Sequence, residues 1–164
     1  MKTRKSLLRR VTFVFPIIVL TAFVFTACDK KDDDKKNNST LFSISGNAGT
    51  SQVVPPVTGS ATATITGTYN SVNGQMITTT NWTNLSSVPT TGGFYMGATG
   101  VNGSLIGEVW SLGTALSTSG TISDTTTLTS DEATELKNGN VYYSLSTATN
   151  PNGEVRGQLT VTPQ

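Results

Sequence analysis

The sequence predicts an all-β domain, an antiparallel immunoglobulin-like β-sandwich or barrel with one short helix near 130–138. Three observations carry this prediction. Apolar and polar residues alternate with period two in several stretches after residue 41, which is typical of strands with one buried face. Threonine and valine, whose branched side chains suit a pleated surface, are frequent there. Glycine, asparagine and proline separate the stretches and mark turns.

The first 27 residues predict a secretory signal. Residues 1–10 are strongly basic, residues 11–27 are apolar, and Cys28, the only cysteine of the chain, follows them. The four residues that end at Cys28, Phe-Thr-Ala-Cys, resemble the lipobox of bacterial lipoproteins, in which the cysteine receives the lipid. We therefore expect a lipoprotein signal peptide at 1–27 and a membrane anchor on Cys28. The alternative is an uncleaved signal anchor, which Pro16 and the short apolar run disfavour.

Residues 28–40 are expected to form the lipidated cysteine and a charged tether. The sequence DKKDDDKKNNST after the cysteine has no apolar residue, which predicts a flexible, solvated linker. An acidic cluster at this place resembles the surface-export signal of lipoproteins in Bacteroidetes-type bacteria, and a plain spacer explains it equally well. The expected location is the cell envelope, as an outer-membrane lipoprotein, with surface exposure and a periplasmic position both open.

Composition excludes several classes of function for residues 41–164, the expected folded domain. Only Lys137 and Arg156 are basic there, against six acidic residues, so the domain has no basic footprint for nucleic acid. The chain has no histidine, which removes the usual general base and the commonest metal ligand. A single cysteine allows no internal disulfide and no multi-cysteine zinc site. We expect no metal and no cofactor.

The strands of the domain are expected in six stretches. In the second stretch Met76, Thr78, Thr80 and Trp82 share one face, because residues two apart on a strand project to the same side. The six expected stretches are 60–69, 75–85, 104–112, 121–129, 140–147 and 153–161.

Turn and cap residues mark where these elements end. The Asn-Gly pair at 73–74 predicts a hairpin, and Pro-Asn-Gly at 151–153 predicts another turn. Thr129 and Glu132 have the spacing of a capping box, and Gly139 stands where a helix would stop. These three residues predict the one helix.

Glu154 and Arg156 are two apart on the last expected strand and so stand on one face, with Val155 directed to the core. One interpretation is a same-face ion pair on a solvated sheet, worth about 0–1 kcal/mol. The other is a partly covered pair that ties the strand to a neighbouring loop, since arginine can bind several carbonyl groups at once. A structural role is favoured over a catalytic one, because no other candidate group accompanies the pair.

The C-terminal part of the chain resembles the signature of the CHRD domain, the module named after chordin and common in bacterial secreted proteins. The sequence NGNVYYSLSTATNPNGEVRGQL at 138–159 carries most of the motif. SQVVPPVTGSATATI at 51–65 resembles the N-terminal Pro-Pro segment of the family, and GATGVNGSLI at 97–106 resembles its central glycine loop. The resemblance covers residues 41–162. The positions to which it assigns a structural motif are Pro55, Pro56, Gly139, Tyr142, Gly153, Glu154, Arg156, Gly157 and Gln158.

The chain departs from the family pattern where members often carry histidine. A His-x-His pair precedes the central loop in those members, and another histidine precedes a threonine nearer the C-terminus. Phe94, Met96 and Ser146 stand at these histidine positions, which would be former metal-site positions if the family binds metal there, and Val53 stands where the family has glutamate. If the family binds metal there, the resemblance implies that this chain has lost the site, because methionine alone is too weak a ligand. The apolar replacements suggest packed core or a recognition surface.

Three functions compete on these observations. The first is a non-enzymatic, lipid-anchored interaction module, a monomer with an unknown protein or glycan ligand. The second is a surface glycan-binding or adhesive domain in which aromatic side chains supply stacking faces, although such residues more often fill a core. The third, a hydrolase, is disfavoured because no pattern pairs Glu108, Asp124 and Glu154. The aromatic residues in question are Trp82, Tyr95, Trp110, Tyr142 and Tyr143.

Overall fold

The computed structural model describes residues 40–113 and 117–164. Within these ranges the chain is mostly β-structure with one α-helix and one short 3₁₀ helix, as predicted for an antiparallel all-β domain. The helices are η1 (Thr50–Gln52) and α1 (Ser130–Lys137). The strands are β1 (Leu41–Gly49), β2 (Thr62–Asn70), β3 (Gln75–Thr83), β4 (Pro89–Met96), β5 (Ser104–Ile106), β6 (Gly120–Thr127), β7 (Val141–Thr147), β8 (Val155–Gln158) and β9 (Thr160–Pro163).

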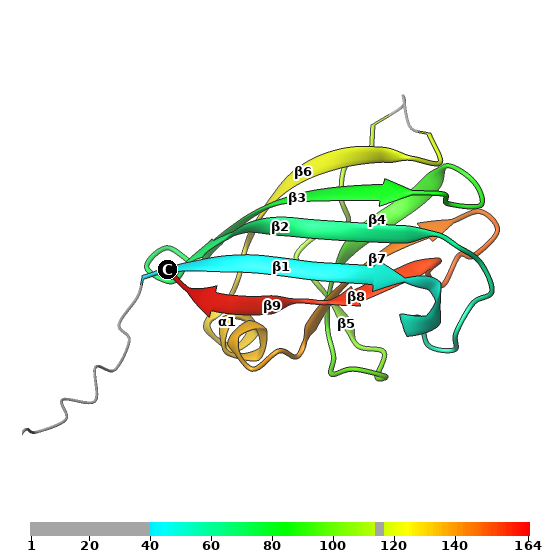
Figure 1. Ribbon diagram of the computed structural model, residues 1–164. Helices are drawn as coiled ribbons and strands as arrows, with labels where there is room; N and C mark the ends of the chain where they lie inside the picture. The colour runs from blue at the N-terminus through cyan, green and yellow to red at the C-terminus, as the bar shows by residue number, and fades with distance from the viewer. Residues whose placement is uncertain (1–39, 114–116) are drawn as a thin grey trace, which may run out of the picture. The chain divides into compact units, whose positions relative to one another are not determined.

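The described strands form one antiparallel sheet with the order β5-β4-β7-β8-β1-β2-β3-β6, and β9 pairs with β1. Figure 1 shows this sheet curling, so that β4 and β7 lie behind β1, β2 and β3. β8 joins the two parts of the curl, since it pairs with β7 over most of its length and with β1 through Gly49 and Arg156. The immunoglobulin-like form of this architecture stays a prediction.

The hydrophobic core lies inside the curl. The alternate residues of β3 from Met76 to Trp82 are all 2% exposed or less, which confirms the buried face expected from the sequence. Tyr143 of β7 spans the interior, and its hydroxyl donates a hydrogen bond to the Ala63 carbonyl oxygen of β2 at 3.0 Å. The same hydroxyl donates to the Gly46 carbonyl oxygen of β1 at 3.2 Å. These bonds connect the inner face of β7 with those of β1 and β2, which lie two and three places along in the sheet.

α1 has the caps that the sequence predicts. The Thr129 hydroxyl accepts a hydrogen bond from the Glu132 amide, and the Glu132 carboxylate accepts one from the Thr129 amide. The helix ends before Gly139, whose φ of 76° favours glycine. Leu136 is fully buried, and the helix contacts β4, β7 and β9.

Several strand boundaries differ from those expected. β1 and β4 were not among the expected stretches, and the strand expected over 104–112 ends at Ile106. Gly107 has a φ of 63°, which takes the chain out of the extended conformation directly after β5. The strand expected over 153–161 is divided at Leu159, whose amide donates to the Val141 carbonyl oxygen and whose side chain is buried.

Candidate functional site

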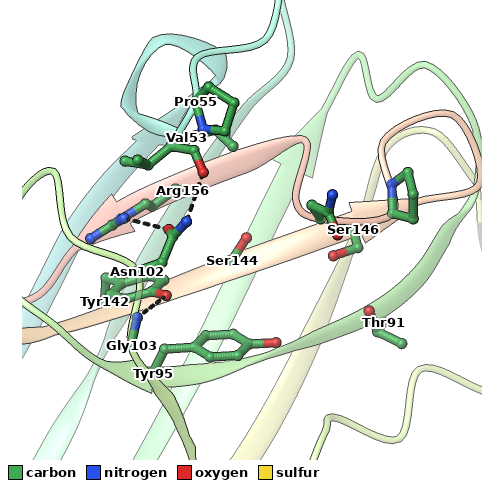
Figure 2. A pocket seen from close by; sticks show the side chains of 13 residues that line it. Val53, Pro55, Thr91, Tyr95, Asn102, Gly103, Tyr142, Ser144, Ser146 and Arg156 are labelled. Carbon is green, nitrogen blue, oxygen red and sulfur yellow. Dashed lines mark hydrogen bonds between the residues drawn. The ribbon is translucent and has the colours of Figure 1, made fainter.

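A pocket of about 410 Å³ lies over one face of β4, β7 and β8 (Figure 2). β4 and β7 pair in antiparallel register, which puts their pocket-facing side chains in rows across the two strands. Tyr95 lies opposite Tyr142 in one row, and Thr91 lies opposite Ser146 in another. The loops around this floor contribute Val53, Val54, Pro55, Asn102, Gly103, Pro151 and Asn152 to the lining.

Three hydroxyl groups on the pocket floor have no hydrogen-bond partner within residues 40–113 and 117–164. They belong to Thr91, Tyr95 and Ser146, and Figure 2 shows these side chains around the same hollow. Ser144, between them on β7, instead donates to the Val155 carbonyl oxygen at 2.9 Å. A free hydroxyl can both donate and accept a hydrogen bond, so this floor suits a ligand with several polar groups.

Arg156 holds the central glycine loop against β8. Its Nη2 donates to the carbonyl oxygens of Ala98 at 2.9 Å and Val101 at 2.8 Å, and its Nη1 donates to Asn102 Oδ1 at 3.2 Å. The guanidinium Cζ lies 3.7 Å from the centroid of the Tyr142 ring. Burial lowers the pKa of Arg156, and the interaction with Tyr142 opposes that shift. The side chain is 3% exposed, so it is an internal tie and not a solvated charge.

The same tie extends to the Pro-Pro segment. Asn102, held by Arg156, donates through Nδ2 to the Val54 carbonyl oxygen at 2.8 Å. Val54 precedes Pro55 across a cis peptide bond, and Pro55 lines the pocket while Pro56 lies beside it. The three segments that carry the family-like motifs therefore meet at one wall of the pocket.

Gln158 and Gly157 complete the contacts of β8. The side-chain Nε2 of Gln158 donates to the carbonyl oxygens of Gly97 and Gly139, both at 2.8 Å. A Cβ atom on Gly157 would lie 2.7 Å from the Asn47 carbonyl oxygen, so only glycine fits there without a shift of the backbone. Gly153 has a φ of 119°, a backbone conformation that favours glycine.

Glu154 binds a different part of the molecule. Its carboxylate accepts hydrogen bonds from the Ser86 amide at 2.6 Å, the Ser86 hydroxyl at 2.7 Å and the Thr147 hydroxyl at 2.6 Å. Burial raises the pKa of Glu154, but the hydrogen bonds from Thr147 and Ser86 outweigh burial and leave the pKa below its ordinary value. Glu154 and Arg156 therefore each hold a separate loop rather than each other, and Val155 between them is fully buried.

The former metal-site positions do not come together. Phe94 and Met96 lie on the face of β4 that turns inward, and Phe94 packs edge-on against Trp110 with ring centroids 5.1 Å apart. Ser146 lies on the opposite face of the sheet, in the pocket. Phe94 is fully buried and is part of the packed core. In the part of the chain that the structure describes, no group of three or more His, Cys, Asp or Glu residues could hold a metal ion.

Most aromatic residues considered for stacking belong to the interior. Trp82, Trp110 and Tyr143 are core residues no more than 4% exposed, whereas Tyr142 lies on the pocket face and is 5% exposed under Arg156. Tyr95 alone among the five is half-buried, and it stacks on Tyr142 with ring centroids 5.2 Å apart and planes at 16°. The sequence could not separate Tyr95 from the others, because the strand that carries it was not recognised.

The three carboxylates considered for hydrolysis do not form one site. Only Glu154 lies apart, since Glu108 and Asp124 both line a second hollow, of about 320 Å³, between the segment after β5 and the edge strand β6. The residues that sequence reasoning missed are Thr91, Asn102 and Ser144. An alternation of Thr91, Gly93 and Tyr95 on β4 was the available signal for the pocket floor.

The signal peptide expected at 1–27, Cys28 and the tether residues 29–39 lie outside the described residues. Within the described residues, no helix is long and apolar enough to span a membrane.

Comparison with known proteins gives one positive finding. The family model described as the CHRD domain matches residues 45–159, more than half of the chain. No curated protein and no solved structure matches the chain.

Proposed function

The chain belongs to the CHRD domain family, and on that premise we propose that it is a lipid-anchored, extracytoplasmic binding module without enzymatic activity. The ligand site in this proposal is the pocket over β4, β7 and β8. The observation that carries it is the contrast between the two sets of polar groups there. The family-motif side chains Glu154, Arg156 and Gln158 are bonded to loops, whereas the hydroxyls of Thr91, Tyr95 and Ser146 stay free for a ligand.

The anchored, extracytoplasmic location rests on the sequence of residues 1–40. The basic start, the apolar run and the cysteine before a charged linker support a lipoprotein of Bacteroidetes-type bacteria held in the outer membrane. A protease added to intact cells tests this location, with a Cys28→Ala variant alongside. Digestion of the wild type on intact cells, with release of the variant, supports a surface lipoprotein. Fractionation of the variant together with the membranes would contradict the lipid anchor.

The non-enzymatic part of the proposal rests on the placement of the carboxylates. Glu154 is enclosed by three hydrogen bonds, and Glu108 and Asp124 line a different hollow, where Asp124 already accepts a hydrogen bond from the Thr126 hydroxyl. A hydrolase of the glycosidase type needs two carboxylates on either side of the scissile bond. Release of products from a polysaccharide panel by the wild type, and its loss in Glu108→Gln or Asp124→Asn, would overturn this part.

A second candidate function, glycan binding, is favoured by one observation. Tyr95 offers a half-buried ring in the same pocket as the free hydroxyls of Thr91 and Ser146, and a sugar ring requires such a combination of an aromatic ring and polar partners. The test is an array of immobilised glycans and peptides, probed with the wild type and with a Tyr95→Ala, Ser146→Ala variant. Glycan binding is supported if the wild type is retained on glycans and the variant is not. Retention on peptides alone supports a protein ligand, and retention unchanged by the variant would move the binding site away from the pocket.

A further inference from the structure

The pocket contains a fixed positive charge and no negative one. Arg156 lines it, and none of the other lining residues is acidic. The nearest carboxylate in the sequence, Glu154, is bonded to Ser86 and Thr147. Among the described residues Arg156 forms no ion pair, and its partners are carbonyl and amide oxygens and the Tyr142 ring. A buried charge without a counter-ion attracts an anionic ligand group more strongly than it would in water.

Arg156 also has donors to spare. A guanidinium group carries five N–H donors, and the bonds to Ala98, Val101 and Asn102 use three of them. The Nε donor and the second Nη1 donor have no acceptor in the described part of the chain. A carboxylate is the group that such donors bind best, through charge-assisted hydrogen bonds.

The rest of the floor suits a sugar ring. The half-buried ring of Tyr95 lines the pocket, and the hydroxyls of Thr91 and Ser146 lie around the same hollow as its own hydroxyl (Figure 2). Ser144, in the row between, is small and leaves the hollow open. The volume of about 410 Å³ falls within the range of about 300–1,000 Å³ found for small-ligand sites.

We propose that the pocket binds a hexuronate residue of an acidic polysaccharide, a sugar ring that carries one carboxylate. This inference rests on the proposed function of a binding module and names the ligand class of the same pocket. The sugar ring packs on Tyr95, its hydroxyls bind Thr91 and Ser146, and its carboxylate is held on the Arg156 side. A neutral sugar would provide no counter-ion for Arg156. A simple anion would not contact the Tyr95 ring or the free hydroxyls.

The experiment is a calorimetric titration of the full chain in detergent micelles. The probes are short oligomers of galacturonate, glucuronate and guluronate, the methyl ester of whichever oligomer binds, and acetate. The ester keeps the ring and removes the charge. We expect at least one oligomer to bind, its ester to bind at least about tenfold more weakly, and acetate to show no measurable binding. Added salt should weaken binding of the acid and leave binding of the ester unchanged.

Matched variants locate the site. Tyr95→Ala should weaken binding of the oligomer at least about tenfold, while Tyr95→Phe keeps the stacking face and costs less. Ser146→Ala should weaken binding, because it removes a free hydroxyl from the floor. Thr64→Val, on the exposed outer face of β2, is the control and should bind like the wild type. Circular dichroism of each variant checks that it is folded.

Each contrary result has a definite meaning. Equal binding of the acid and its ester overturns the acidic ligand and leaves the glycan-binding function standing. Acetate as strong as the oligomer reduces the site to an anion site and overturns the sugar. Failure of all three oligomers overturns the inference, while the array experiment separately decides whether the module binds anything through this pocket. If the folded Tyr95→Ala variant binds the oligomer as the wild type does, the placement of the ligand in this pocket is overturned.

Discussion

Arg156 and Tyr142 form a buried cation–π pair, in which the guanidinium Cζ lies 3.7 Å from the ring centroid. The guanidinium group also donates hydrogen bonds to the loop carbonyl oxygens of Ala98 and Val101, so it is bound by the loop as well as by the ring. Tyr95 stacks against the same ring. The wall and the floor of the pocket are therefore parts of one packed unit, which keeps the site formed without a ligand.

Arg156→Ala should strongly destabilise the domain. The variant removes three hydrogen bonds from a charged donor and leaves three loop acceptors, at Ala98, Val101 and Asn102, without it. We expect the free energy of unfolding to fall by about 2–4 kcal/mol, measured by urea denaturation. Lys137→Ala is the matched control, since that exposed cation lies 5.0 Å from the Phe42 ring and should contribute less than about 1 kcal/mol. An unchanged urea midpoint for Arg156→Ala would contradict the role of the loop tie.

Glu154→Gln should alter how stability depends on pH. Burial raises the pKa of Glu154, but the hydrogen bonds from Thr147 and Ser86 prevail and hold it below the ordinary value of 4.5. A carboxyl group whose pKa is depressed by folding stabilises the fold above its unfolded pKa, and this contribution is lost as the pH falls through the folded pKa. The wild type should therefore lose more stability than Glu154→Gln between about pH 6 and about pH 3.

The measurement for Glu154 is urea unfolding at a series of pH values. Glu108→Gln, at an exposed position after β5, serves as the control and should keep the pH profile of the wild type. Parallel profiles for the wild type and Glu154→Gln would show that the hydrogen bonds of Glu154 do not favour its ionised form.

Gly157→Ala should be poorly tolerated, whereas Gly49→Ala should be accepted. A Cβ on Gly157 would lie 2.7 Å from the Asn47 carbonyl oxygen and 2.8 Å from the Tyr143 ring, both within the packed sheet. The nearest heavy atom to a Cβ on Gly49 is 4.0 Å away, and its φ of −154° is ordinary extended backbone. We expect Gly157→Ala to cost about 2 kcal/mol or more and Gly49→Ala about 0.5 kcal/mol or less. Similar thermal unfolding midpoints for the two variants would contradict the close packing of β8 on β1.

Histidines placed at the former metal-site positions should not create a zinc site. In a variant with Phe94→His, Met96→His and Ser146→His, the third imidazole lies on the opposite face of the sheet from the first two. Phe94→His alone should lower stability by about 2–4 kcal/mol, because it puts a polar ring into the core. Zinc titration by calorimetry is the measurement, with Ser146→His as the folded control. A one-to-one zinc complex of the triple variant would overturn this placement.

The sequence predicted β2, β3 and α1 well. Strict alternation placed β2 and β3, and the capping box of Thr129 and Glu132 placed α1. It did not reveal β1 or β4, whose alternation is interrupted by the glycines that the packing requires. Gly46, for example, lies so close to Gln158 and Tyr143 that a Cβ would reach 2.7 Å from a carbonyl oxygen. This need for glycine at position 46 is set by residues of other strands, and it therefore leaves no pattern in the sequence around Gly46.

The candidate site was accessible to sequence reasoning only in part. Spacing put Glu154 and Arg156 on one strand with Val155 in the core, but the loop residues that they bind, Ser86 and the 98–102 segment, lie more than 50 residues away along the chain. Period-two reasoning cannot identify such partners. Phe94 and Ser146 seemed to belong together only because a family motif links them, and the strand register separates them.

The position of β8 in the sheet has a consequence for how the domain is made. The four strands β1, β2, β3 and β6 and the three strands β4, β5 and β7 meet through Val155–Gln158, which follows all seven of them in the sequence. Without that segment β1 and β7 would lack the strand that joins them, and the loops bound by Arg156 and Glu154 would lose those partners. Closure of the sheet is therefore expected to be a late and slow step of folding, because it depends on contacts between residues far apart in the sequence.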